Sequence, residues 1–175
     1  MLQGVFIKPV AAMHFTTSIT PDGEFHIIFD QQGVALASGF GTATELQKRL
    51  PMELQSKQLI EEQDHPYQQL VKSYYRGSGA ALDAIPRHQE GSDFQKCIWS
   101  VLSAIPYGQT ISYKELSEKA GSPRAVRAAG TACGMNRLTL LIPCHRVLKS
   151  DGSCGNYLYG SKTKESLLKR EGVSI

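Results

Sequence analysis

The sequence predicts an α+β fold, in which residues 1–88 form an α/β part with a small antiparallel sheet and residues 89–175 form a mostly helical part. Three observations support this fold class. Strand-forming stretches separated by turn residues lie before residue 41, a stretch rich in Gly and Pro spans residues 77–91, and helical patterns with N-cap residues follow it. We therefore expect two structural units joined by a linker.

The composition of the 175 residues is that of a globular protein, with 41% hydrophobic and 20% charged residues. It excludes disorder as the main state, because the apolar content is ordinary and no charge run dominates. The sequence has no run of about 18 uncharged apolar residues, which excludes a transmembrane helix. Lys8 and Pro9 interrupt the one segment that resembles a signal peptide. We expect a soluble protein located in the cytoplasm, or in the nucleus if the source is a eukaryote.

The first part begins with predicted strands. Residues 25–30 (FHIIFD) are β-branched and aromatic, and residues 34–40 form a further strand-like stretch. Residues 20–23 (TPDG) and 31–33 (QQG) have the composition of turns, and the first of them is typical of a hairpin. These patterns predict the antiparallel sheet.

Two helical segments are predicted after the strands. Leucines at helical spacing start after Thr44, and Pro51 breaks the pattern. Residues 65–75 predict a second helix, with one apolar face formed by Tyr67, Leu70, Val71 and Tyr74. The linker follows this helix.

The second part opens with a predicted helix that Ser92 or Asp93 caps, and residues 106–108 (PYG) end it. Its expected apolar face consists of Phe94, Cys97, Ile98, Val101, Leu102 and Ile105. A short helix is expected over residues 113–120, with Ser112 as N-cap and Glu115 completing a capping box.

A further helix is predicted directly after Gly121, with Ser122 as N-cap, Pro123 in its first position and an extent from Arg124 to about Met135. Two short helices joined by a turn that contains Gly are typical of a helix-turn-helix. The second helix is rich in Ala and Arg, so it favours either close approach to DNA or tight packing against another helix. Both interpretations stay open at this point.

Charge is distributed unevenly along the chain. Residues 1–91 carry seven Lys and Arg against ten Asp and Glu, a net charge of −3, whereas residues 92–175 carry twelve against six, a net charge of +6. A basic second part suggests an anionic partner, and nucleic acid is the first candidate. The charge distribution therefore favours the DNA interpretation of the helix-turn-helix.

All four cysteines lie in the second part: Cys97, Cys133, Cys144 and Cys154. Their spacing contains no C-x2-C or H-x3-H pair, which a tetrahedral zinc site would use, and a chain of this length does not need disulfides to fold. We therefore predict free thiols and no bound metal.

Cys144 and His145 lie next to each other in the apolar stretch LLIPCHRVL. A thiol in dry surroundings keeps its proton, so nucleophilic chemistry requires a base and a carboxylate that orients the base. Asp151, Glu165 and Glu171 are the downstream candidates for this carboxylate. The alternative is a structural Cys beside a core His.

The segment IPCHRV, preceded by SPRAVRAAGTACGMN and followed by DGSCGNYLYG and KESLLKREG, resembles the O6-alkylguanine-DNA alkyltransferase family. The resemblance begins at Asp93, continues through IPYGQT and ISYKEL to Gly172, and is weaker in the first part. It implies a ribonuclease H-like first domain, residues 1–88, and a winged helix-turn-helix-like DNA-binding domain, residues 89–175, that carries the active site. It implies no cofactor.

The resemblance implies an irreversible, stoichiometric transfer of a methyl or larger alkyl group from O6-alkylguanine in DNA to Cys144. His145 corresponds to the base that takes the thiol proton through a water, and Glu171 to the carboxylate that holds this histidine. Asn136 corresponds to a residue that links the recognition helix to the active-site turn, and Tyr113 to the hydroxyl that donates to the departing guanine. The protein would thus act once, in the direct reversal of DNA damage.

The expected partner is double-stranded DNA that contains O6-alkylguanine, with O4-alkylthymine as a second candidate substrate and no membrane. The damaged nucleotide would be flipped out of the duplex from the minor groove, and Arg127 corresponds to the finger that fills the gap. The other expected DNA contacts are Ser112, Arg124, Ala128 and Arg146. The resemblance also favours a monomer.

The expected substrate pocket contains Tyr157 as an aromatic wall, together with Val147, Thr139, Leu158 and Tyr159. Leu158 and Tyr159 are bulkier than the small residue and glycine that many members carry, so we expect a narrowed pocket that disfavours large alkyl groups. A non-catalytic helix-turn-helix protein that binds DNA or its lesions is the alternative, and a cysteine hydrolase is a third hypothesis.

Overall fold

The computed structural model describes residues 12–175, and its first unit is a four-stranded sheet. Strands β1 (Met13–Thr20), β2 (Gly23–Phe29), β3 (Ala35–Phe40) and β4 (Leu59–Glu61) lie in the order β3-β2-β1-β4. The predicted hairpin turn joins β1 to β2, and the hydroxyl of Thr20 donates to the carbonyl of Gly23. The first three strands are antiparallel, as expected.

The prediction of a purely antiparallel sheet is wrong at one edge, because β4 pairs with β1 in parallel. The connection from β3 to β4 contains the short helices α1 (Ala43–Gln47) and α2 (Met52–Gln55), which Pro51 separates. This helical crossover returns the chain to the end of the sheet at which β3 began. Strand β4 therefore runs in the same direction as β3 and β1.

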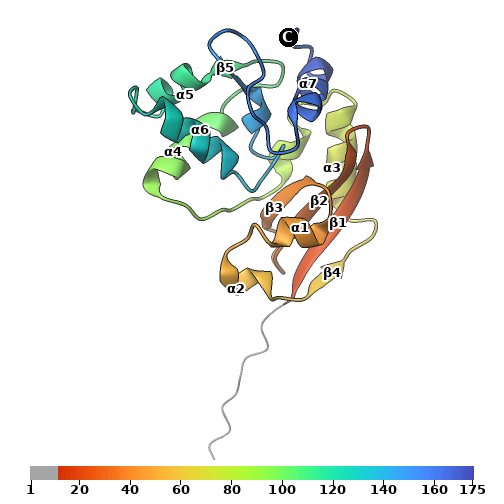
Figure 1. Cartoon of the computed structure of the whole chain (residues 1–175). Helices are drawn as coiled ribbons and strands as arrows, with labels where there is room; N and C mark the ends of the chain where they lie inside the picture. The colour runs from red at the N-terminus through yellow and green to blue at the C-terminus, as the bar shows by residue number, and fades with distance from the viewer. Residues whose placement is uncertain (1–11) are drawn as a thin grey trace, which may run out of the picture.

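Helices cover both faces of the sheet (Figure 1). On one face, Phe25, Ile27 and Phe29 pack into the main core together with residues of α3 (Pro66–Tyr75). On the other face, Ile28 packs with Leu46 of α1. Successive residues of β2 therefore serve opposite faces, and the strand is buried on both.

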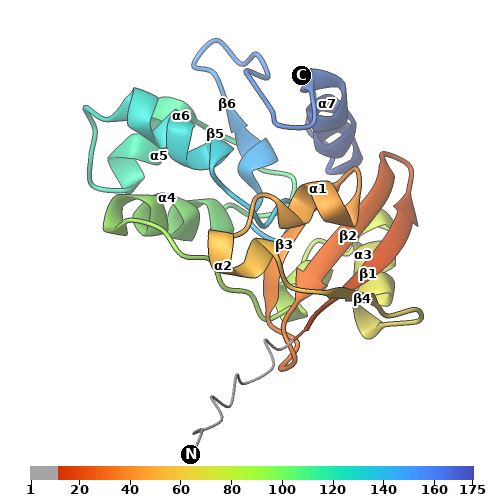
Figure 2. The same cartoon turned by 60° about the horizontal axis from the view of Figure 1, so that its bottom comes forward.

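The second part is a cluster of helices beside the sheet (Figure 2). It contains α4 (Asp93–Ser103), α5 (Tyr113–Lys119), α6 (Val126–Gly134) and α7 (Ser161–Arg170), which follow the short helix η1 (Ala81–Ala84). The strands β5 (Ile111–Ser112) and β6 (Val147–Leu148) pair in parallel, and the 3-10 turn η2 (Cys144–Arg146) leads into β6. Ser92 caps α4 and Ser112 caps α5, as the sequence predicts; both form capping boxes, of which the one at Ser112 was predicted.

Two details of these helices differ from the prediction. The buried residues of α4 are Ile98, Trp99 and Leu102, whereas Cys97 is exposed. The indole of Trp99 points inward and donates a hydrogen bond to the carbonyl of Ala132 (2.9 Å). Helix α6 begins at Val126 and not at Arg124, because residues 122–125 form a turn closed by the amide of Ala125 and the carbonyl of Ser122 (2.9 Å).

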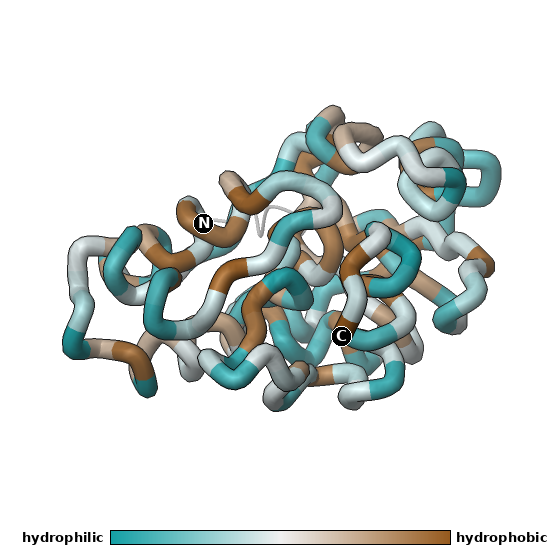
Figure 3. Tube along the Cα trace, turned by 90° about the horizontal axis from the view of Figure 1, so that it is seen from above, coloured by the Kyte–Doolittle hydropathy of each residue, from teal (hydrophilic) through white to brown (hydrophobic). Residues whose placement is uncertain are grey.

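The two parts share one continuous core, which contains Phe25 and Val71 from the first part and Ile98, Leu116 and Leu167 from the second. Hydrophobic and hydrophilic residues alternate in short stretches along the described trace (Figure 3). No helix within residues 12–175 is long and apolar enough to cross a membrane.

The backbone of β3 also joins the two parts directly. Ser38 donates its amide to the carbonyl of Arg137 (2.8 Å) and accepts from the amide of Thr139 (3.1 Å), and its hydroxyl donates to the carbonyl of Thr139 (2.7 Å). The sheet edge thus holds the segment that leads from α6 to Cys144.

Candidate active site

Cys144 lines a cavity of about 560 Å³ in the second part. One wall is α6, which contributes Arg127, and the opposite wall is the loop that carries Tyr157 and Leu158. Tyr113, Asn136 and Thr139 also line the cavity. The structure therefore brings together two thiols, those of Cys133 and Cys144, with two tyrosines and an arginine.

The amide of Asn136 connects the end of α6 to Cys144. Its Nδ2 donates to the carbonyl of Ile142 (2.8 Å) and approaches Sγ of Cys144 (3.4 Å). Its Oδ1 accepts from the amide of Leu138 (3.0 Å) and from Nε2 of Gln89 (3.1 Å). A fully bonded, buried amide holds the loop before Cys144 in one conformation.

The half-buried thiol of Cys144 is in surroundings that keep it protonated. Burial raises its pKa, against the opposing effects of the hydrogen bond from Asn136 and the positive charge of Lys164. A neutral thiol is a weak nucleophile, so the site requires a base.

His145 and Glu171 lie behind Cys144 as a buried pair. Nε2 of His145 is 2.8 Å from Oε1 of Glu171, and both side chains are fully buried. An ionised carboxylate only accepts hydrogen bonds, so Nε2 carries the hydrogen of the neutral ring and Nδ1 is the acceptor. Nδ1 is buried and has no hydrogen-bond partner among the described residues. The ring is therefore prepared to accept a proton at Nδ1.

The charges of this pair follow from its surroundings. Burial favours the neutral form of Glu171, but hydrogen bonds from His145 and Arg146 outweigh it and lower the pKa to about 2. Burial lowers the pKa of His145, against the opposing effect of Glu171. Near neutral pH the carboxylate is therefore ionised and the imidazole is a neutral base.

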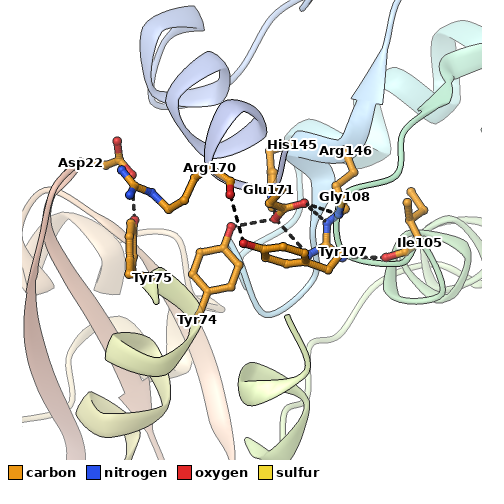
Figure 4. Close-up of polar contacts among 10 residues, drawn as sticks. All are labelled: Asp22, Tyr74, Tyr75, Ile105, Tyr107, Gly108, His145, Arg146, Arg170 and Glu171. Atoms are coloured by element: carbon orange, nitrogen blue, oxygen red, sulfur yellow. Dashed lines mark hydrogen bonds and ion pairs between the residues drawn. The ribbon is translucent and has the colours of Figure 1, made fainter. Parts of the chain in front are cut away.

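The prediction that Arg146 contacts DNA is wrong, because its side chain is 7% exposed and points inward (Figure 4). Its Nε donates to Oε2 of Glu171 (2.8 Å) and its Nη2 to Oε1 (3.0 Å). Its Nη1 donates to the carbonyl of Ile105 (2.6 Å). A buried guanidinium with these partners supports the carboxylate instead.

Two predicted pocket residues lie outside the cavity. Val147 is fully buried in β6, and the ring of Tyr159 packs edge-on against Phe40, with 5.3 Å between the ring centroids. Tyr159 therefore does not narrow the pocket, and that expectation is wrong for it. Leu158 does line the cavity, and it is 55% exposed.

The hydroxyl groups of the pocket are protonated near neutral pH. Burial, the largest cause, raises the pKa of Tyr113 to about 12, and burial also raises the pKa of Tyr157. Both hydroxyls can therefore donate a hydrogen bond to a bound molecule. The hydroxyl of Tyr157 is buried and has no partner among the described residues.

The remaining predicted DNA contacts lie on the surface around α6. Arg124, Arg127 and Ala128 are exposed, whereas Ala129 and Ala132 of the same helix are buried. The small residues of α6 therefore serve two faces, one packed inward and one exposed. Ser112 is half-buried as the N-cap of α5, and its hydroxyl accepts from the amide of Glu115 (3.1 Å).

Sequence reasoning missed one buried cation next to the pocket. Lys164 of α7 is fully buried, and its Nζ donates to the carbonyls of Val147 and Cys154 and lies 5.8 Å from the ring centroid of Tyr113. Its position three and four residues before Leu167 and Leu168 places it on the inward face of α7, and this spacing was the available signal.

The second residue that sequence reasoning missed is Tyr74 of α3, whose hydroxyl donates to Oε1 of Glu171 (2.7 Å). Its helical spacing from Tyr67 and Val71 predicts burial, and a buried tyrosine hydroxyl requires a partner. The spacing does not name that partner, because it comes from the other end of the chain.

The described residues 12–175 contain no group of three or more His, Cys, Asp or Glu side chains that could hold a metal ion. All four cysteines are free thiols, and Cys133 is the buried one.

Comparison with known proteins gives one family match, in the second part of the chain. Residues 93–173 match the family described as 6-O-methylguanine DNA methyltransferase, DNA binding domain. A methylated-DNA–protein-cysteine methyltransferase of Methanosarcina barkeri is 45% identical over 101 residues, which cover 58% of this chain and 63% of that protein. This chain spans less than two thirds of the length of the first curated relatives that it matches.

Solved structures match nearly the whole chain. The O6-methylguanine methyltransferase of Mycobacterium tuberculosis has a TM-score of 0.73 and 25% identity, covering 91% of this chain and 92% of that one. The structure of Mycobacterium tuberculosis OGT in complex with DNA has a TM-score of 0.71 and 26% identity, covering 90% and 92% of the two chains. The likeness in fold therefore includes the sheet as well as the helical part.

Proposed function

We propose that this chain, whose residues 93–173 match the family of 6-O-methylguanine DNA methyltransferases, repairs DNA by transferring the alkyl group of O6-alkylguanine to Cys144. The observation that carries the proposal is the position of Cys144, which lines a cavity and directly precedes His145 of the buried His145–Glu171 pair. A structural cysteine would need neither the cavity nor the pair.

The chemical step is a displacement at the alkyl carbon. The thiol proton passes to Nδ1 of His145 through a bridging water, and the thiolate attacks the alkyl carbon. The bond between that carbon and O6 breaks and its electron pair stays on O6. The hydroxyl of Tyr113 supplies a proton to the guanine and regains one from the imidazolium of His145 through solvent, so guanine leaves in its neutral form and both side chains end as they began. The products are guanine in DNA and a thioether on Cys144, so each molecule acts once.

The exposed side of α6 is the surface that would meet DNA. The lesion lies inside the duplex, so the nucleotide must leave the base stack, which costs a few kcal/mol. Arg127 lies at the rim of the cavity and is exposed, as a side chain that takes the place of the extruded base must be. Binding from the minor groove suits a protein that searches all sequences, because base readout there is degenerate.

The site roles divide between the elements that surround the cavity. Asn136 positions Cys144, Tyr157 forms the aromatic wall against the flipped base, and Ser112, Arg124 and Ala128 lie where the DNA backbone would pass. We also propose that the protein acts as a monomer in the cytoplasm, or in the nucleus if the source is a eukaryote. Among the described residues, exposed large apolar side chains lie on separate elements, such as Ile19 on β1, Met52 on α2 and Met135 at the end of α6, which supports a monomer.

The decisive experiment is the intact mass of the protein after incubation with a duplex that carries one O6-methylguanine, followed by peptide mapping. We expect one methyl group on Cys144 and restored guanine in the DNA. The Cys144→Ser variant is expected to lose transfer and keep DNA binding, and Cys97→Ser, which changes an exposed thiol outside the cavity, is the matched control that keeps both. Tight binding to the lesion without a mass shift would instead indicate a lesion-binding protein without the reaction.

A further inference from the structure

Tyr74 is the residue through which the first part of the chain reaches the pair behind Cys144. It lies on α3, is 1% exposed, and donates its hydroxyl to Oε1 of Glu171 at 2.7 Å (Figure 4). Burial, reinforced by the negative charge of Glu171, raises the pKa of Tyr74 far above its usual range. The hydroxyl therefore stays protonated, and toward a carboxylate it can only be the donor.

Five donors surround the carboxylate of Glu171. Oε1 accepts from Tyr74 (2.7 Å), His145 (2.8 Å) and Nη2 of Arg146 (3.0 Å). Oε2 accepts from Nε of Arg146 (2.8 Å) and from the amide of Gly108 (3.2 Å). The guanidinium binds both oxygens, so the bond to His145 depends on what else holds Oε1 in place.

Charged and titratable groups face this pair from every packed element. Tyr74 comes from α3, Tyr107 from the loop after α4, and Arg146 from η2, and each of them interacts with the charge of Glu171. Lys164 of α7 acts on His145 in the same direction as Arg146, lowering its pKa. Tyr74 and His145 are the donors on Oε1 without a permanent charge, and Tyr74 is the one that does not take part in proton transfer.

We propose that Tyr74 is a positioning residue for the reaction of Cys144: its hydroxyl holds Oε1 of Glu171 on Nε2 of His145 and thereby keeps Nδ1 free to accept the thiol proton. Without the hydroxyl, Oε1 shifts toward the permanent charge of Arg146, and the bond to His145 weakens. The imidazolium then loses stabilisation, so the thiol keeps its proton to a higher pH. This inference rests on the proposed function for its consequence in DNA repair.

The neighbouring Tyr75 provides a matched control. Its hydroxyl donates to Oδ2 of Asp22 (3.0 Å), and Arg170 lies 5.0 Å from its ring centroid, so it has the same chemistry as Tyr74 and lies on the same helix. It makes no hydrogen bond to Glu171 in the described part of the chain. Tyr74→Phe and Tyr75→Phe each remove one hydroxyl that donates to a carboxylate. In Tyr74→Phe that carboxylate is Glu171, whereas in Tyr75→Phe it is Asp22, which is not part of the site.

The experiment measures the rate of iodoacetamide labelling of Cys144 against pH, together with the single-turnover rate of methyl transfer from an O6-methylguanine duplex. For Tyr74→Phe we expect the pH midpoint of labelling to rise by about half a unit or more and methyl transfer near neutral pH to slow by about fivefold. For Tyr75→Phe we expect the wild-type midpoint and a transfer rate within about twofold of wild type. An unchanged or lowered midpoint in a folded Tyr74→Phe protein would overturn the proposal.

A double variant tests whether Tyr74 acts through Glu171. In the Glu171→Gln background, Tyr74→Phe is expected to shift the midpoint by less than about 0.3 pH unit and to change the rate by less than about twofold, because the carboxylate it positions is gone. A full additional loss would show that Tyr74 acts by another route. The labelling measurement needs no DNA, so it tests this inference even if the wild-type protein were to transfer no methyl group.

Discussion

At the scale of single residues, the site depends on the buried carboxylate of Glu171 and on the hydrogen-bond donors that surround it. Glu171 is 5% exposed, and hydrogen bonds from His145 and Arg146 keep it ionised. Gly108 shows how closely the chain packs there. Its φ is +77°, its amide donates to Oε2 of Glu171, and a Cβ at this position would lie 2.8 Å from the carbonyl oxygen of Glu171. Only glycine fits that position without displacing the backbone.

The lowered pKa of Glu171 predicts a pH dependence of stability. The pKa falls from 4.5 to about 2 on folding, so the carboxylate stabilises the folded protein above the unfolded value and this stabilisation is lost as the pH falls through that window. We expect the wild type to lose on the order of 3 kcal/mol more than Glu171→Gln over this window. Urea unfolding at a series of pH values measures the difference, and parallel losses in the two proteins would contradict it.

At the scale of elements, the start of α6 decides what the helix offers to a partner. Because the helix begins at Val126, Arg127 lies in its first turn at the rim of the cavity, and Arg124 lies in the preceding turn outside it. Ala129 and Ala132 face inward, where Trp99 bonds to the carbonyl of Ala132. One helix thus packs against the core and exposes an arginine next to Cys144.

Arg127→Ala is expected to separate extrusion of the nucleotide from the chemical step. Transfer from a duplex should slow by about tenfold or more, because nothing replaces the extruded base, while reaction with free O6-methylguanine base should stay within about twofold. Single-turnover rates on the two substrates measure this. Arg124→Ala removes the same charge outside the cavity and should weaken DNA binding without changing the rate at saturating DNA. Equal losses on duplex and free base would contradict the role of Arg127.

At the scale of the whole molecule, the first part helps to build the site as well as the fold. Ser38 of β3 holds the backbone on both sides of Leu138, and Tyr74 of α3 reaches Glu171. The main core contains residues of both parts, so neither part buries its apolar surface alone. We therefore expect one cooperative unfolding transition for the described chain.

Leu138→Ala tests the shared core. The side chain is fully buried opposite Ser38, so its truncation should lower the free energy of unfolding by about 2–5 kcal/mol. Fluorescence of the single tryptophan, Trp99, follows the second part, and far-UV circular dichroism follows both. The two signals should change together in denaturant. Met52→Ala, at a side chain that is 84% exposed, is the control and should change stability by less than about 0.5 kcal/mol.

Separate fluorescence and circular dichroism transitions would contradict a shared core. They would instead support two units that fold independently at the predicted boundary between residues 88 and 89.

Local signals predicted much of the fold and of the chemistry. The N-cap at Ser92, the capping box at Ser112, the hairpin turn at residues 20–23 and the helix over residues 66–75 follow from side chains and backbone only a few residues apart. The parallel strand β4 was not predictable in this way, because residues 21–58 separate it from its partner β1 in the sequence. The inward turn of Arg146 was missed for the same kind of reason, since its partner Glu171 is 25 residues away.

Residue type and short-range spacing were enough to identify Cys144, the neighbouring His145, the α+β class and the family resemblance. The tertiary structure decided which carboxylate meets His145, that Arg146 supports this carboxylate, and that Tyr74 completes its shell of donors. It also decided which pocket residues line the cavity and which, such as Tyr159, pack elsewhere. The hydrogen bonds of Glu171 join residues that are 25 to 97 positions apart in the sequence, and only the packing of the whole core brings them within hydrogen-bond distance.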